Sequence, residues 1–185
     1  MDDANSEIYS AFFVPEEGTM SSFIGIRYVI ETHGLFCSLY TDRGSHYWHT
    51  PEAGGKVDKE NLTQVGRAMQ QLGIEMIPAY SPEARGRSER MLGTLQNRLP
   101  QELRSLGITS MDKANRYLKE VFIPAHNARF GKPPAEEASA FVSFAGNVRD
   151  TLCVQEDRTV GNDNTVRYKN LVLQIAADQH RRHIS

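Results

Sequence analysis

The sequence contains few cysteines, no long apolar run and no stretch that resembles a secretion signal. Its two cysteines, Cys37 and Cys153, lie far apart and lack any paired spacing, so we expect buried, reduced side chains without a disulfide or redox role. No apolar run approaches the ~20 residues that cross a bilayer. The acidic start, MDDANSEIYS, does not resemble a signal peptide. These absences predict a globular cytoplasmic protein with no membrane partner.

An excess of one charge is also missing, because the formal net charge is −2 at neutral pH. Any nucleic-acid role must therefore depend on a local cluster of basic side chains. Such a cluster occupies 84–104, where five arginines against two glutamates give a local balance of +3. Three of these arginines, Arg85, Arg87 and Arg90, lie close together, and Gly86 between them allows a backbone to approach closely.

The spacing of apolar residues predicts alternating strands and helices in the first half of the chain. A long polar loop is predicted over 43–63, and Gly34 and Gly73 follow two predicted helices as stop signals. The alternation favours an α/β layer fold. Strands are expected at 7–14, 35–41 and 74–80, and helices at 20–31 and 64–72.

Two longer helices are predicted in the second half. Leucines recur at steps of three and four residues from Leu92 to Leu106, which is typical of an amphipathic helix, and Pro100 should kink it. A further helix is predicted over 111–129, bent at Pro124. A β-hairpin with the turn Lys169-Asn170 is predicted within 158–175. The inward side chains of the 111–129 helix are expected to be Tyr117, Leu118, Val121, Phe122 and Ala125.

Asp42 ends the strand-like run in the stretch LYTDRGSHYWHTP. Asp, Gly and Ser are ordinary turn residues, so a turn alone would explain the sequence. A carboxylate at the carboxyl end of a central strand is also where α/β folds place reacting groups. Choosing between the two interpretations requires a second carboxylate that could meet the first.

Glu89 is the candidate for that second carboxylate. It lies three residues before Leu92, at the start of the leucine face, so its side chain should point toward the sheet. A buried carboxylate needs a partner, and a divalent metal shared with Asp42 would supply one. Two carboxylates without a Cys or His ligand set suit Mg²⁺ or Mn²⁺, and such sites perform phosphoryl transfer.

Simpler interpretations of these side chains stay open at this stage. Glu89 could be a first-turn glutamate favoured by the helix dipole, and the arginines could form a solvated face. The histidines His33, His46 and His49 do not form a ligand-spaced set, so we do not expect them to bind a metal.

The combined motifs resemble a known superfamily. The stretches LYTDRGSHY and LGIEMIPAYSPEARGRSERMLGTLQNRL resemble the catalytic core of DDE transposases and retroviral integrases, most closely bacterial insertion-sequence transposases of the ISNCY type. HNARFGKPP resembles the tail of that core, and DNTVRYKNLVLQI resembles its small C-terminal β module. The resemblance implies an RNase H-like mixed sheet flanked by helices over 1–131, a linker over 132–157 and a partial β-barrel module over 158–185.

The same resemblance implies DNA cleavage and strand transfer with a two-ion Mg²⁺ or Mn²⁺ site. Asp42 and Glu89 would be the second and third acidic ligands of that site. The implied partners are transposon-end DNA, target DNA and further copies of the chain, associated with the bacterial nucleoid. The implied DNA-contacting residues are Arg85, Arg87, Arg90 and Asn127.

One departure from the family pattern concerns the opening strands. The start of the sequence, with Asp2 and Asp3, matches the family's turn before its third strand, so the first acidic ligand and its strand are expected to lie before Met1. With two of three ligands, the chain alone is expected not to cleave or join DNA. In the family order 3-2-1-4-5, the strands at 7–14 and 35–41 would lose the neighbours between them. We therefore expect exposed edges and association unless these two strands pair directly.

Two alternative functions stay open. An RNase H-like nuclease would use the same carboxylates, and joining of donor-end DNA separates it from a transposase. A non-catalytic DNA-binding or dimerising remnant of a transposase would lack activity of its own.

Overall fold

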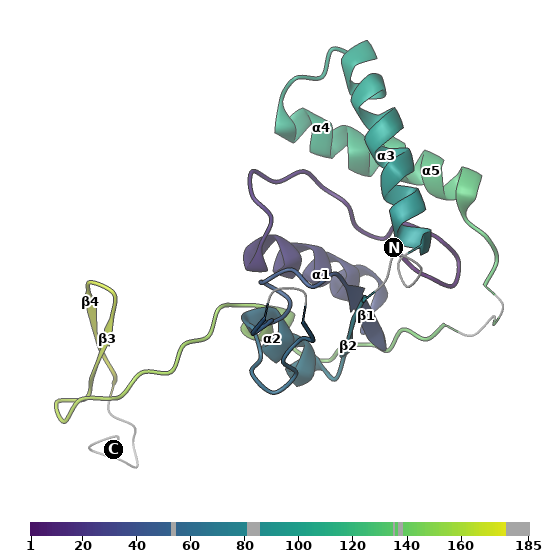
Figure 1. Cartoon of the computed structure of the whole chain (residues 1–185). Helices are drawn as coiled ribbons and strands as arrows, with labels where there is room; N and C mark the ends of the chain where they lie inside the picture. Colours follow the sequence, from purple (N-terminus) through teal and green to yellow (C-terminus); the bar gives the residue numbers. More distant parts are fainter. Residues whose placement is uncertain (53–54, 81–85, 135, 137–138, 177–185) are drawn as a thin grey trace. The chain divides into compact units, whose positions relative to one another are not determined.

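The computed structural model describes residues 1–52, 55–80, 86–134, 136 and 139–176, with the backbone alone over 86–90. The chain divides into two compact units, Met1–Cys153 and Val154–Ser185 (Figure 1). Within the described ranges, no helix is long and apolar enough to cross a membrane.

A two-stranded parallel sheet lies in the first unit. It pairs β1 (Ser38–Thr41) with β2 (Glu75–Pro78) in a register that sets Thr41 opposite Pro78. Both strands were predicted from the sequence, although each is shorter than expected. The helices and small sheets confirm the α/β class, whereas the RNase H-like arrangement stays a prediction.

Two helices form the main core with this sheet. α1 (Thr19–His33) buries Phe23, Ile26 and Ile30, and α2 (Gln64–Leu72) buries an apolar face against them. The predicted bounds of α2 are confirmed because both ends carry local signals. The hydroxyl of Thr63 accepts a hydrogen bond from the Gly66 amide at 3.1 Å, and Gly73 ends the helix. The buried residues of α2 are Val65, Gly66, Ala68, Met69 and Leu72.

The end of α1 requires a glycine. Gly34 has a φ of 107°, and a Cβ at this position would lie 2.6 Å from the carbonyl oxygen of Val142. The next residue, Leu35, exchanges two backbone hydrogen bonds with Val142, at 2.7 and 2.9 Å. Gly34 therefore brings a segment more than 100 residues away in sequence against the start of the sheet.

A short helix that was not predicted completes this core. α6 (Val148–Thr151) begins at Asn147, whose side chain accepts a hydrogen bond from the Arg149 amide, and it buries Val148. Arg67 of α2 donates to the carbonyl oxygens of Thr151 at 3.1 Å and Cys153 at 2.6 Å. The predicted linker thus contains a packed helical turn.

The predicted strand at 7–14 is wrong, because the structure assigns no strand there. A strand needs a backbone neighbour, and this segment is bordered by side chains instead. The ring of Phe12 lies beside Gly25 of α1, and Ala11 packs in a second apolar cluster around Leu99. The two segments at 7–14 and 35–41 do not pair with each other in the described structure.

The second cluster joins three helical segments. α3 (Gly86–Ser105) runs through Pro100 as one helix and buries Leu99. The predicted helix at 111–129 is instead α4 (Met111–Tyr117), a π-helical turn (Leu118–Phe122) and α5 (Ile123–Phe130).

The π-helical turn changes which side chains face inward. Pro124 has no N–H to donate to a carbonyl in the preceding turn, and wider turns of this kind relieve that loss. Leu118 and Phe122 are buried as predicted, but the next buried side chain is His126. The inward assignment of Val121 and Ala125 is wrong, because both are exposed.

The second unit contains the predicted hairpin. β3 (Thr165–Tyr168) pairs antiparallel with β4 (Leu171–Gln174), and Tyr168 opposite Leu171 leaves the two-residue turn expected at Lys169-Asn170. Every residue of β4 is exposed.

The cysteines are both free, and the prediction that they are buried is wrong for Cys37. Cys37 is exposed just before β1, and Cys153 is half-buried.

Candidate active site

Asp42 lies at the carboxyl end of β1, where both parallel strands of the sheet end. Its Oδ1 accepts a hydrogen bond from the Gly44 amide at 3.0 Å, and the residue is half-buried. This is an Asx turn, so the turn interpretation of Asp42 is correct. The position at the carboxyl end of a strand is correct as well, and the two interpretations are compatible.

A buried hydrogen bond supports the backbone under Asp42. Thr41 is only 6% exposed, and its hydroxyl accepts a hydrogen bond from the indole N–H of Trp48 at 2.8 Å. The carbonyl oxygen of Thr41 accepts from the amide of Ala79 at 2.9 Å. Bonds to both neighbouring segments hold the end of β1 in place and limit the positions that Asp42 can adopt.

Gly44 brings Asp42 and His46 close together. A Cβ at position 44 would lie 3.0 Å from Oδ1 of Asp42 and 3.1 Å from Cε1 of His46. The Gly44 carbonyl oxygen accepts hydrogen bonds from the amides of Tyr47 and Trp48, which closes the turn. Only a residue without a side chain fits this turn without displacing the carboxylate or the imidazole.

His46 has a carboxylate near its outer nitrogen. Its Nε2 lies 3.8 Å from Oε1 of Glu17, which precedes α1. Within the described ranges, no group of three His, Cys, Asp or Glu side chains is placed to hold a metal ion.

Arg43 and Tyr80 lie at the same end of the sheet, although no sequence pattern indicated a role for them. The guanidinium of Arg43 lies 5.4 Å from the ring centroid of Tyr80 and donates to the carbonyl oxygen of Gly55 at 3.0 Å. The hydroxyl of Tyr80 accepts from the amide of Val57 at 3.2 Å. These contacts place a cation and an aromatic ring at the end of the sheet where Asp42 lies.

Glu89, Arg87 and Arg90 belong to the first part of α3, where the structure describes the backbone alone. Arg85 lies outside the described residues. The meeting of the Asp42 and Glu89 carboxylates stays a prediction, as do the DNA contacts of the three arginines.

Asn127, the fourth predicted DNA contact, is bound to the protein's own backbone. Its Oδ1 accepts a hydrogen bond from the Ile8 amide at 2.9 Å, and its Nδ2 donates to the Ile8 carbonyl oxygen at 3.1 Å. Both polar ends of this carboxamide hold the 7–14 segment against α5. Its contact with DNA stays a prediction.

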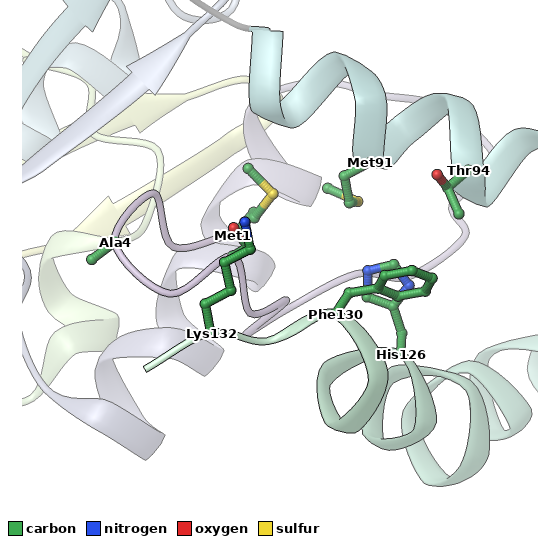
Figure 2. Close-up of a pocket in the computed structure, with 8 residues that line it drawn as sticks. Met1, Ala4, Met91, Thr94, His126, Phe130 and Lys132 are labelled. Atoms are coloured by element: carbon green, nitrogen blue, oxygen red, sulfur yellow. The ribbon is translucent and has the colours of Figure 1, made fainter. Parts of the chain in front are cut away.

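A cavity of about 300 Å³ lies between α3, α5 and the first residues of the chain (Figure 2). His126 lines it, is 6% exposed, and has a buried Nδ1 without a hydrogen-bond partner in the described structure. Burial, and secondarily the charge of Arg98, lower the pKa of His126. No described lining residue is acidic, so this cavity lacks the ligands that Mg²⁺ prefers. The lining residues are Met1, Ala4, Ser6, Met91, Thr94, His126, Phe130 and Lys132.

Comparisons with known proteins identify relatives over most of the chain. No family model matches. The chain is 33% identical over 174 residues to "Putative transposase y4bF" of Sinorhizobium fredii, covering 91% of this chain and 37% of the relative. It is 28% identical over 172 residues to "Transposase for insertion sequence IS1202" of Streptococcus pneumoniae, covering 92% of this chain and 36% of the relative.

These matches place the chain among proteins related to transposases. The matches support the bacterial insertion-sequence transposase that the sequence motifs predicted, whereas the narrower DDE and ISNCY assignments stay predictions. It spans only 37% and 36% of the length of these two relatives.

Proposed function

We propose that this chain contains part of the catalytic core of a DNA transposase, with Asp42 and Glu89 as acidic ligands of Mg²⁺ or Mn²⁺. The single observation that carries the proposal is the match to two transposases over more than nine-tenths of the chain. The structure supports it with a half-buried carboxylate fixed at the carboxyl end of a parallel strand.

The chemistry proposed for this core is transfer of phosphodiester bonds. Divalent ions between the acidic ligands would polarise the phosphate and activate the attacking oxygen, first of water and then of a DNA 3′-hydroxyl. The hydrogen bond from the Gly44 amide would fix the orientation of the Asp42 carboxylate for metal binding. Arg43 and the basic start of α3 would attract the DNA phosphates.

The proposed partners are transposon-end DNA, target DNA and further copies of the chain. The relatives are named as transposases, and the family resemblance implies these DNA partners. With Asp42 and Glu89 as two of the three acidic ligands that the resemblance implies, these residues alone would bind metal and DNA without joining DNA.

Metal binding at Asp42 can be tested without an activity assay. Mn²⁺ titrated into the protein should broaden the NMR signals of the Thr41 and Gly44 amides, and Asp42→Asn should abolish the broadening. Asparagine keeps an oxygen for the Gly44 amide, so the turn should persist. Asp58→Asn is a matched control, because Asp58 is half-buried like Asp42 and its carboxylate also accepts hydrogen bonds from backbone amides.

Glu89→Gln provides the second half of the test. It should weaken the same Mn²⁺ effect if the two carboxylates share an ion. Broadening that persists in both variants, or is absent from the unmodified chain, would contradict the metal site and favour a non-catalytic remnant.

A further inference from the structure

Two side chains at the carboxyl end of the sheet hold a short part of the long loop that follows β1, residues 55–57, which we call the strap. Arg43 donates to the carbonyl oxygen of Gly55 at 3.0 Å, and the hydroxyl of Tyr80 accepts from the amide of Val57 at 3.2 Å. The two side chains also contact each other, with the Arg43 guanidinium 5.4 Å from the ring centroid of Tyr80. Both ends of the strap are therefore fastened where the two strands end.

Lys56 lies between these two hydrogen bonds, so the backbone on both of its sides is held. The side chain of Val57 is buried and anchors the strap in the interior, whereas Lys56 is exposed. Because its backbone is already fixed, Lys56 loses less conformational entropy on binding a ligand than a lysine on a free loop would. The strap therefore presents an ammonium group within a restricted region at the end of the sheet where Asp42 lies.

No carboxylate neutralises this ammonium group within the part of the chain that the structure describes. None of the ion pairs found there includes Lys56. Asp58 is the nearest acidic residue in the sequence, but its carboxylate accepts hydrogen bonds from the amides of Glu60 and Asn61. The charge of Lys56 is therefore available to an anion from outside the chain.

We propose that Lys56 contacts a phosphate of the DNA backbone beside the metal site proposed at Asp42. An ammonium group binds a phosphate through its charge and its hydrogen bonds, and such a contact positions the DNA without reading its sequence. Arg43 and Tyr80 are positioning residues for this contact, because they hold the strap that carries Lys56. The inference rests on the proposed function, from which it takes DNA as the partner.

Lys56→Gln tests the contact in the whole chain. Fluorescence anisotropy measures the binding of a labelled DNA duplex of arbitrary sequence between about 50 and about 200 mM salt. We expect the dissociation constant at low salt to rise about three- to tenfold, and the slope of log affinity against log salt to become shallower by about one. Lys59→Gln is the matched control. It removes the same charge from another exposed lysine of the loop, outside the strap, and should change both quantities much less.

Tyr80→Phe tests whether the strap positions Lys56. Phenylalanine keeps the ring beside Arg43 but cannot accept from the Val57 amide, so NMR should show faster hydrogen exchange at that amide. DNA binding should weaken in this variant. The loss should be much smaller when Lys56→Gln is already present, because the strap then carries no cation. A direct contact of Tyr80 with DNA would instead give additive losses in the double variant.

A larger loss in Lys56→Gln than in Lys59→Gln, coupled to the effect of Tyr80→Phe, supports the proposal. Equal losses in the two lysine variants, additive losses with Tyr80→Phe, or no DNA binding by the unmodified chain would overturn it. The Mn²⁺ broadening should persist in Lys56→Gln. A metal site that is intact while Lys56→Gln has no effect on DNA binding therefore contradicts this inference alone, whereas absence of the broadening from the unmodified chain contradicts the proposed function.

Discussion

Asn115 and Asn127 each bind the backbone of the same extended segment with a side-chain carboxamide. Asn127 exchanges two hydrogen bonds with Ile8, and Asn115 accepts from the Phe13 amide at 2.6 Å and donates to the Phe13 carbonyl oxygen at 3.0 Å. Side chains of α4 and α5 thereby provide the donor and acceptor that a neighbouring strand would otherwise supply. The two contacts differ in burial, which leads to a testable difference.

Asn127→Ala should destabilise the first unit by about 1–3 kcal/mol, because it leaves the buried amide and carbonyl of Ile8 without partners. Ile8 is 2% exposed, so water cannot easily replace the carboxamide. Asn115→Ala should cost less, because Phe13 is 37% exposed and water can reach its backbone. Urea unfolding followed by circular dichroism measures both. Equal losses in the two variants would mean that burial does not set the strength of this contact.

Gly44→Ala should disturb the turn that holds Asp42. The added methyl group would lie 3.0 Å from the Asp42 carboxylate and 3.1 Å from the His46 ring, which predicts a loss of about 1–3 kcal/mol in unfolding free energy. In a His46→Ala background one of these contacts disappears, so the same substitution should cost less. A double-mutant cycle by thermal unfolding measures this coupling. Strict additivity would show that His46 does not restrict position 44.

Thr41→Val should leave the indole N–H of Trp48 without its buried acceptor. Valine keeps the shape of threonine, so the expected loss of about 1–3 kcal/mol reflects the unpaired donor. Trp48 is the single tryptophan of the chain, and its fluorescence reports the change directly. Thr50→Val is a suitable control, because the Thr50 hydroxyl is buried without a hydrogen-bond partner in the described structure. It should be neutral or stabilising.

The stability of the first unit should fall on acidification because of His126. Burial holds the pKa of His126 below its usual value of about 6.5. A lowered pKa in the folded state gives stability that is present above the unfolded pKa and is lost as the pH falls through the folded pKa. Titration of this one group can change the free energy of unfolding by at most about 1.4 kcal/mol per pH unit.

His126→Phe removes that contribution and keeps a ring between Phe122 and Phe130. Urea unfolding between pH 7.5 and 5 should therefore show a shallower loss of stability in this variant. His49→Gln, at an exposed histidine, is the control. The prediction is wrong if the variant and the unmodified protein lose stability in parallel.

Local signals explain which elements could be predicted from the sequence. α2 matches its predicted bounds because Thr63 caps one end and Gly73 ends the other. The strand predicted at 7–14 does not form. Its apolar and β-branched residues favour an extended backbone, but a strand also needs a neighbouring strand with which to form hydrogen bonds. α6 is only four residues long and gives no periodic pattern, although Asn147 is a recognisable cap. Val121 and Ala125 were misassigned because the π-helical turn changes the helical period locally.

Some features of the candidate site could likewise be predicted from the sequence, and others could not. The turn at Asp42 depends on residues within two positions, so its sequence pattern was sufficient. The contact of Arg43 with Tyr80 joins two strand ends that are distant in sequence, and no local pattern marks it. Asn127 was predicted to contact DNA, but a sequence alone does not indicate that its carboxamide would reach Ile8.

The two hydrogen bonds from Arg67 to the carbonyl oxygens of Thr151 and Cys153 have a practical consequence for dissecting the protein. They attach the last residues of the first unit to a buried helix, so the backbone there should resist proteases while the residues just beyond it are cut. A fragment ending at Cys153 should retain the fold around Asp42, whereas one ending before Val148 would lose part of that core.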